Sequence, residues 1–88
     1  MEMRELKLDG NAIGGLLLEV FGVEMTVATS VCGHCGAVGQ VAQLDVYVHA
    51  PGTVVRCPGC EGVLMRIVRG PGRTWLDLTG VRSLEIRS

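Results

Sequence analysis

The stretch that decides the fold reads SVCGHCGAV, residues 30–38, and a second stretch, CPGC, follows at residues 57–60. Each holds two cysteines with two residues between them, so that both thiolates can lie on one side of a tight turn. The chain has four cysteines, and 21 residues separate the two pairs. Two such pairs at this separation are typical of a four-cysteine metal site. The predicted metal ligands are Cys32, Cys35, Cys57 and Cys60.

The first pair alone would also suit a disulfide isomerase, whose active-site tetrapeptide is Cys-Gly-His-Cys. Such an enzyme needs its cysteine pair at the N-terminus of a helix, which lowers the pKa of the thiol. Here Cys35 is followed by glycine and then by a strand pattern, and a second matched pair is present. The sequence therefore favours a metal over a redox dithiol and over unliganded core cysteines.

Four thiolates in a tetrahedral shell suit zinc or a single iron. The two loops resemble those of rubredoxin, but rubredoxins pack their iron beneath many aromatic residues and are strongly acidic. This chain has three aromatic residues and a net charge of −1. We therefore expect one structural Zn²⁺, with iron as the less favoured alternative.

Four cysteines fill the tetrahedral shell and leave no position for water or substrate. The chain is therefore expected not to be an enzyme, and no catalytic residue, further cofactor or small-molecule substrate is predicted. The two histidines, His34 and His49, are expected to be exposed surface side chains rather than ligands.

With 88 residues, the chain is expected to form one domain over residues 1–88. A domain of this size buries too little surface to be firmly stable without a metal, disulfides or a partner. Structural zinc contributes about 10–16 kcal/mol of apparent binding free energy, which is comparable with the usual net stability of about 5–15 kcal/mol. Chelation of the metal is therefore expected to unfold the strand region.

One N-terminal helix is predicted over residues 9–22. Asp9 is expected to cap its start through the carboxylate, and Gly22 to end it in the left-handed conformation. Residues 1–8 are expected to be loose or weakly extended. Apolar residues within the helix recur at helical spacing and form one stripe: Ile13, Leu16, Leu17, Val20 and Phe21.

From residue 25 to residue 88 the pattern predicts an antiparallel β ribbon, with turns at residues 50–53 and 70–73. Along it, Leu44, Val46 and Val48 are expected to share one face, and Leu76 and Leu78 to face inward. The last strand, in which Val81 and Leu84 are out of step by one, indicates either a β-bulge or a weak strand. The predicted strands cover residues 25–31, 41–48, 53–57, 63–69, 74–78 and 81–87. The expected fold class is a small mostly-β zinc ribbon: an antiparallel sheet of four to five short strands with one N-terminal α-helix, stapled by the four-cysteine metal site.

The motifs CGHCG and CPGC, with the strands attached to them, resemble zinc ribbons over residues 25–69. The fuller pattern of LDGNA, EVFG, the two cysteine pairs and GRTWLDL is similar to a family of small bacterial zinc-ribbon proteins, actinobacterial in type and of unknown function. The resemblance implies a fold and a metal, but no activity. Glu61 stands where many ribbons have a glycine, and it is expected to shift one N–H···S contact.

Charge is unevenly distributed along the chain. Residues 1–50 hold two basic and six acidic residues, whereas residues 51–88 hold six arginines and three acidic residues.

No run approaches the roughly 20 apolar residues that span a bilayer, and the longest apolar segment is interrupted by acidic residues. We therefore expect a cytoplasmic protein with no membrane partner, a setting in which structural disulfides are rare.

The function expected from these features is that of a non-catalytic zinc-binding module, an adaptor that docks on a larger protein assembly. Trp75 or Tyr47 would supply anchors, since aromatic residues are favoured at binding hot spots; Trp75 could instead be a partly buried cover for the sheet. Nucleic-acid binding, on ribosomal RNA or DNA, is the first alternative, followed by zinc-responsive regulation and, more remotely, rubredoxin-like electron transfer. The candidate phosphate contacts are Arg56, Arg66, Arg69, Arg73, Arg82 and Arg87.

Overall fold

The computed structural model describes residues 7–49 and 51–87, which form short strands, one α-helix and two 3₁₀ turns. The predicted fold class is confirmed, since the protein is mostly β with a single short α-helix among its described residues. In chain order the elements are β1 (Lys7–Asp9), a 3₁₀ turn (Gly10–Ile13), α1 (Gly14–Phe21), β2 (Thr29–Cys32), β3 (Val38–Gln40), a second 3₁₀ turn (Val41–Gln43), β4 (Asp45–His49), β5 (Gly52–Arg56), β6 (Val63–Gly70), β7 (Arg73–Asp77) and β8 (Val81–Glu85).

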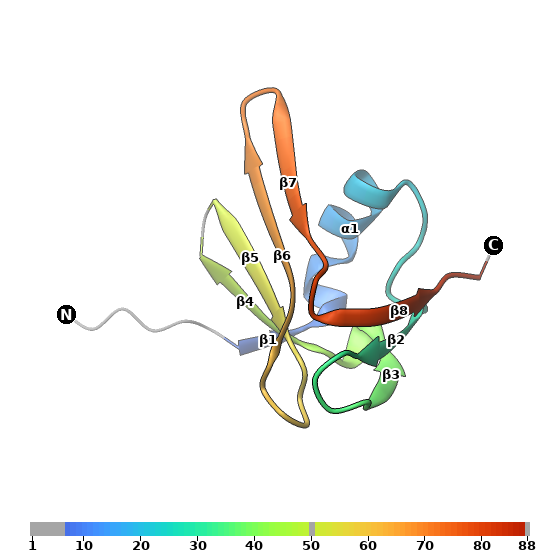
Figure 1. The fold of residues 1–88 in the computed structure, drawn as a ribbon. Helices are drawn as coiled ribbons and strands as arrows, with labels where there is room; N and C mark the ends of the chain where they lie inside the picture. The colour runs from blue at the N-terminus through green and yellow to red at the C-terminus, as the bar shows by residue number, and fades with distance from the viewer. Residues whose placement is uncertain (1–6, 50, 88) are drawn as a thin grey trace.

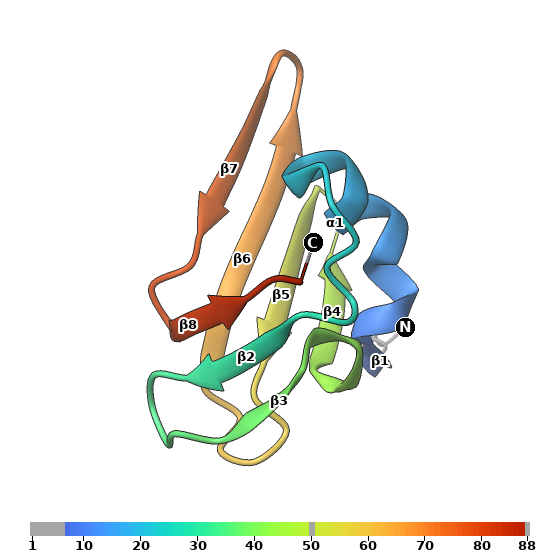
Figure 2. The ribbon, with the colours of Figure 1, turned by 90° about the vertical axis from the view of Figure 1, so that its right-hand side faces the viewer.

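The strands are divided between two antiparallel sheets. The larger has the order β1-β4-β5-β6-β7 and the smaller the order β3-β2-β8. Figures 1 and 2 show α1 and the smaller sheet lying on the same side of the larger sheet. Where the sequence predicted one sheet, there are two, because the chain leaves the larger sheet after β7 and pairs β8 with β2.

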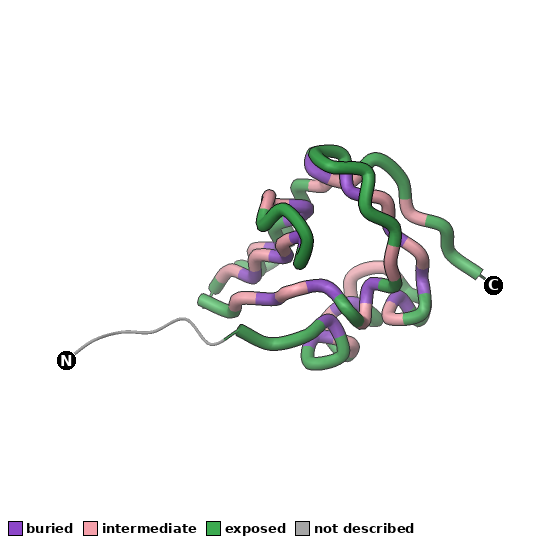
Figure 3. Tube along the Cα trace, turned by 90° about the horizontal axis from the view of Figure 1, so that it is seen from below, coloured by how far each residue is buried: buried purple, intermediate pink, exposed green. Residues whose placement is uncertain are grey.

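An aliphatic core fills the space between the two sheets and the helix. Figure 3 shows buried positions recurring along the strands between less buried ones. Of the helical stripe, Ile13 and Leu17 are buried, and the other three residues pack against the core. Burying one such aliphatic side chain contributes about 1.5–3 kcal/mol. The remaining buried hydrophobic residues are Met25, Ala28, Cys32, Val41, Leu44, Val46, Val55, Cys57, Leu64, Met65 and Ile67.

The predicted helix begins differently from the expectation. Asp9 precedes the first 3₁₀ turn, but its carboxylate makes no capping hydrogen bond, so that prediction is wrong. Asp9 belongs instead to β1, where it pairs with Asp45 of β4. At the other end, Gly22 is left-handed with φ of 76° and its N–H donates to the carbonyl of Leu18, as predicted. Within the described residues, none of the helices has the length and apolar character to span a bilayer.

Local hydrogen bonds shorten the first predicted strand, which begins at Thr29 rather than at residue 25. The carboxylate of Glu24 accepts from the N–H and hydroxyl of Thr26, and the carbonyl of Met25 accepts from the N–H of Ala28. Side chains that bond to nearby backbone in this way compete with sheet pairing.

The next predicted strand, 41–48, also starts late. Its first three residues form the second 3₁₀ turn, and β4 begins at Asp45. The sequence missed the short strand β3 before it. Of the predicted loose segment 1–8, residues 1–6 lie outside the described residues, and the rest joins β1. Residue 50 of the predicted turn 50–53 and residue 88 also lie outside them.

Leu76, which was expected to face inward, is half exposed, and so is Val48, which was expected to share a face with the buried Leu44 and Val46. Val48 and Leu76, at 44% and 43% exposed, end the same cross-strand row, whose middle members Thr53 and Ile67 are buried. The core therefore covers only the middle of this row. Leu78, the other residue expected to face inward, does pack against the core.

Of the two alternatives for the last strand, the bulge is the one observed, where β8 pairs with β2. The register shifts between Val31, which faces Ser83, and Cys32, which faces Val81.

Gly80 joins the two sheets where the chain crosses between them. Its N–H donates to the carbonyl of Leu64 in β6, and its carbonyl accepts from the N–H of Gly33 after β2. A β carbon at position 80 would lie 1.9 Å from the carbonyl oxygen of Val63, so the crossing needs a glycine.

Candidate metal centre

The four predicted ligands come from two hairpin loops, one in each sheet. Cys32 is the last residue of β2 and Cys35 lies in the loop to β3; Cys57 follows β5 and Cys60 lies in the loop to β6. Figure 1 shows these loops side by side at one end of the molecule. The four Sγ atoms all lie within 4.8 Å of one another. The fold therefore brings together all four residues selected from the sequence.

The spacing of the sulfur atoms fits a tetrahedral metal. Metal–sulfur bonds of about 2.3 Å imply edges of about 3.8 Å between the sulfur atoms of a tetrahedron. The Sγ atoms of Cys32 and Cys60 are 3.8 Å apart, and those of Cys35 and Cys57 are 3.7 Å apart. Disulfide sulfur atoms would be about 2.05 Å apart, and all four cysteines are free. The four cysteines are thus positioned to bind one metal ion.

The two loops have the same backbone hydrogen bonds at equivalent positions. In the first, the N–H of Gly36 donates to the carbonyl of Cys32 over 2.9 Å, and in the second the N–H of Glu61 donates to Cys57 over 2.8 Å. The N–H groups of Cys32 and Cys57 in turn donate across their loops, to Ala37 at 2.9 Å and to Gly62 at 3.0 Å respectively. Each loop is therefore closed by its own backbone hydrogen bonds.

Backbone N–H groups also point at the sulfur atoms. The N–H groups of His34 and Cys35 donate to the Sγ of Cys32 at 3.3 and 3.4 Å. In the second loop the N–H of Gly59 donates to Cys57 at 3.3 Å, and that of Gly62 to Cys60 at 3.4 Å. Such contacts orient the sulfur atoms and disperse the negative charge of thiolates.

The surroundings of Cys32 and Cys35 shift the pKa values of their thiols in opposite directions. Burial opposes ionisation of Cys32, but the N–H groups of Cys35 and His34, with two neighbouring thiols, lower its pKa to about 6. For Cys35 the N–H of Ala37 lowers the pKa, but burial and the surrounding thiols outweigh it and raise the pKa to about 12. Adjacent thiols cannot all ionise without a cation, because like charges repel. A bound divalent cation would therefore stabilise the fully ionised form of the four thiols.

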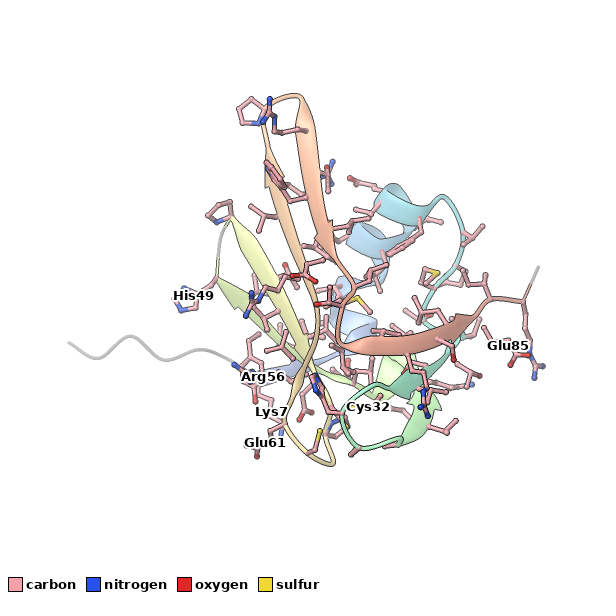
Figure 4. All side chains as sticks on the ribbon, in the orientation of Figure 1. Lys7, Cys32, His49, Arg56, Glu61 and Glu85 are labelled. Carbon is pink, nitrogen blue, oxygen red and sulfur yellow. The ribbon has the colours of Figure 1, made fainter. Side chains whose placement is uncertain are left out.

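Glu61 has an unusual backbone conformation, with φ of 63°, and the equivalent residue of the first loop is Gly36, with φ of 81°. The expected shift of an N–H···S contact is wrong, since the N–H of Gly62 still reaches Cys60. Arg56 helps to hold the turn, because its Nη1 donates to the carbonyl of Glu61 at 2.9 Å. Figure 4 shows Arg56, Glu61 and Cys32 at the same end of the molecule.

His34 is exposed, as predicted, but it has a role that the sequence did not reveal. Its Nε2 lies 2.9 Å from the carbonyl oxygen of Val63, and since a carbonyl only accepts, Nε2 donates. The ring also packs so closely on Gly62 that a β carbon there would lie 2.6 Å from it. His34 of the first loop therefore braces the second loop. His49 is exposed at the end of β4 and is not part of the cluster.

Among the described residues, one small cavity borders the cluster and another borders His34. One, of about 120 Å³, is lined by Cys32 and Cys57 together with apolar residues such as Leu44 and Leu64. The other, of about 220 Å³, is lined by His34 and by polar residues that include Asp77. Ligand sites usually enclose about 300–1,000 Å³, so both are smaller than a typical small-molecule site.

The model of a protein family described as a family of unknown function, DUF6510, matches residues 3–88. No curated protein and no solved structure matches the chain.

Proposed function

The chain belongs to the DUF6510 family of unknown function, and from its geometry we propose that it is a non-catalytic zinc-binding module of the zinc-ribbon type that serves as an adaptor on a larger protein assembly. The observation that carries the metal part is the pair of sulfur–sulfur separations, 3.8 and 3.7 Å, each of which joins a loop of one sheet to a loop of the other.

A structural role for the ion follows from the donor set. Four thiolates complete a tetrahedral shell and leave no open position at which a substrate or an activated water could bind. The cavity beside the cluster and the cavity beside His34 are both too small for a typical ligand. Both arguments support a module without catalytic activity, and the sulfur-only shell favours zinc over the harder metals.

Elemental analysis of the natively purified full chain tests the metal. We expect one zinc ion per chain, and loss of the β-sheet circular dichroism on treatment with a strong chelator. Replacement of Cys35 by serine is expected to prevent a stable fold, whereas Ser83→Ala, an exposed change on β8, should retain the metal. Folded protein that contains no transition metal would contradict the proposal, and a red iron-loaded protein would favour electron transfer instead.

A face of the larger sheet on which none of the described elements packs supports the adaptor part. The outer face, as we call the side of the larger sheet opposite α1, carries Tyr47 beside Val54 and Trp75 beside Val68 in register. Trp75 is 62% exposed, so it is not the partly buried cover that the sequence left open. Exposed aromatic residues with aliphatic neighbours are typical of anchors at protein interfaces.

Nucleic-acid binding is a second candidate, favoured by the presence of Arg66 and Arg73 on the outer face with the two aromatic residues. Sheets that bind single-stranded nucleic acid combine stacking aromatics with basic side chains. Two of the six arginines are already engaged, however: Arg56 bonds to Glu61, and Arg69 forms an ion pair with Glu19 of α1. We therefore place this candidate second.

Two measurements separate these candidates. Affinity capture from a native lysate with the immobilised full chain should retain a specific protein that is lost with Trp75→Ser, which leaves the cysteines untouched. The same capture after chelation tests whether metal occupancy controls the interaction. A gel shift on random RNA and DNA, repeated at rising salt, should show no retardation; retardation that weakens with salt would favour the second candidate.

A further inference from the structure

One edge of the larger sheet is free. β6 pairs with one side of β7, and β7 ends the strand order, so none of the described strands pairs with its other side. All five residues of β7 are exposed, and Figure 1 shows the β6–β7 hairpin projecting beyond the other strands. A free edge of this kind can pair with another chain by extending the hydrogen-bonded ladder. Residues 74–76 also lack the charges and prolines that usually prevent such pairing.

The turn between β6 and β7 determines which backbone groups face the free edge. Gly70 pairs with Arg73 around the two-residue turn Pro71–Gly72. In an antiparallel ladder, a pair either forms hydrogen bonds between its own two residues or lies between neighbours that do. The second pattern would need the N–H of residue 71, and Pro71 has none. Gly70 and Arg73 therefore bond to each other, and hydrogen-bonded and non-hydrogen-bonded pairs alternate along the two strands from there. Residues 73, 75 and 77 therefore bond to β6, whereas Thr74 and Leu76 direct their N–H and C=O groups outward.

The sequence of β7, Arg-Thr-Trp-Leu-Asp, is complementary to itself in the antiparallel direction. When Trp75 lies opposite Trp75 of a second copy, Arg73 of each copy lies opposite Asp77 of the other. In the same register Thr74 faces Leu76, so the outward-directed backbone groups of the two strands meet. An arrangement with a two-fold axis between the two Trp75 residues therefore pairs the opposite charges and also the free backbone N–H and C=O groups.

We propose that β7 pairs with β7 of a second copy of this chain and forms a two-fold symmetric dimer with one sheet continuous across both copies. The outer face then carries an unbroken apolar row, because Val68 lies beside Trp75 in each copy. Asp77, which already lies opposite Arg66 within its own sheet, gains a second arginine from the other copy. Opposite charges and aromatic pairs across strands both stabilise such pairing, most closely in non-hydrogen-bonded pairs.

Sedimentation of the metal-loaded full chain tests the dimer. An interface formed by one edge strand is smaller than the standard size of about 1,600 Å², so we expect a reversible monomer–dimer equilibrium between about 10 μM and 1 mM. Arg73→Glu places like charges in two cross-strand pairs and should weaken dimerisation about tenfold or more. Arg82→Glu makes the same change of charge at an exposed position on β8 and should leave the equilibrium unchanged.

Mixing two variants tests the register. Arg73→Glu and Asp77→Arg should each be monomeric alone, but an equimolar mixture should form a heterodimer, since both cross-strand pairs then carry opposite charges. Thr74→Pro should also give a folded, metal-loaded monomer, because the N–H that it removes faces away from β6.

Three outcomes would overturn the proposal. The wild-type chain could stay monomeric over the whole concentration range, which would leave the edge to a different protein. Arg73→Glu could dimerise as strongly as the wild type. The mixture of two folded charge variants could remain monomeric.

Discussion

At the scale of single residues, Glu61 occupies a conformation that disfavours any side chain. Its φ of 63° lies in the left-handed region, as does the φ of 81° of Gly36 in the other loop, where no β carbon is present. A non-glycine residue in this region costs about 1–2 kcal/mol, of which the greater freedom of an unfolded glycine offsets a part.

Glu61→Gly is therefore expected to stabilise the metal-bound protein by about 0.5–1 kcal/mol in urea unfolding. Gly36→Ala, the matched change in the other loop, should destabilise it by about 1–2 kcal/mol, although a β carbon there meets no other atom within 4 Å. A less stable Glu61→Gly variant would show that the glutamate makes a compensating contact.

A second prediction concerns His34, which links the loops through its bond to the carbonyl of Val63. Groups that orient ligands without binding the metal typically change metal affinity by about 10–100-fold. His34→Ala should weaken zinc binding by such a factor, as measured by competition with a chromophoric chelator. His49→Ala, which removes the other exposed histidine, is the control. If the wild type and His34→Ala bound zinc with equal affinity, the hydrogen bond from His34 to Val63 would not help to position the ligands.

Acidity gives a third prediction at this scale. Near pH 7 a metal ion must displace protons at least from Cys35, whose pKa is raised to about 12, and from Cys60, whose pKa is also raised. Since bound metal and protons compete, affinity falls as pH falls, by at least about a hundredfold per pH unit for two protons. Cys32, with its pKa of about 6, adds another proton only near and below that pH, so the dependence should steepen there. An affinity that is constant between about pH 8 and 6 would contradict this competition.

The cysteines could be predicted from the sequence because their spacing is local. Two thiols three residues apart share a turn whatever the rest of the fold does. The role of His34 could not be predicted, because its partner Val63 lies 29 residues further along the chain. A close contact between Gly62 and a ring gives no pattern in the sequence until the two loops are placed together.

At the scale of elements, the spacing of apolar residues and the residues typical of turns predicted the helix and most strands. They failed where contacts between distant parts of the chain determine the structure. The alternating pattern over residues 63–78 predicts the β6–β7 hairpin and its turn, both of which form. The division into two sheets depends on the pairing of β8 with β2, about 50 residues apart, and no local pattern encodes it. The same holds for β1, whose partner β4 lies beyond the helix.

The helix region offers a matched pair of glycine substitutions. In α1, Gly15 is exposed and a β carbon there would meet no atom within 4 Å, whereas at Gly10 it would lie 1.8 Å from the carbonyl oxygen of Val41. Alanine is favoured over glycine within a helix by about 1 kcal/mol. Gly15→Ala should therefore raise the free energy of unfolding by about that amount. Gly10→Ala should lower it, because the first 3₁₀ turn must move away from the second. Equal stability of the two variants would contradict the close packing of these turns.

At the scale of the whole molecule, the cysteine cluster joins a loop of each sheet at one end of the aliphatic core that packs between the sheets. The described connections near it are the bonds of Gly80 to both sheets and the bond of His34 to Val63. The smaller sheet consists of strands of four, three and five residues, and so small a sheet is marginal unless it packs against other structure. Removal of the metal should therefore release the smaller sheet first.

Hydrogen exchange with and without a chelator tests this order of unfolding. Without metal, the thiols of the two loops no longer share a cation, and β2 and β3 lose the link that holds them to β5 and β6. Amide protection in β2 and β3 should fall by at least about a hundredfold, the effect of losing about 3 kcal/mol of local stability. Protection in the longer strands β5 and β6, which pair with each other and bury Val55, Met65 and Ile67, should fall less at the same chelator concentration. Restoring zinc should restore both. Protection that falls equally in the two sheets would mean that they unfold as one cooperative unit, and protection that does not change would mean that the metal does not hold them together.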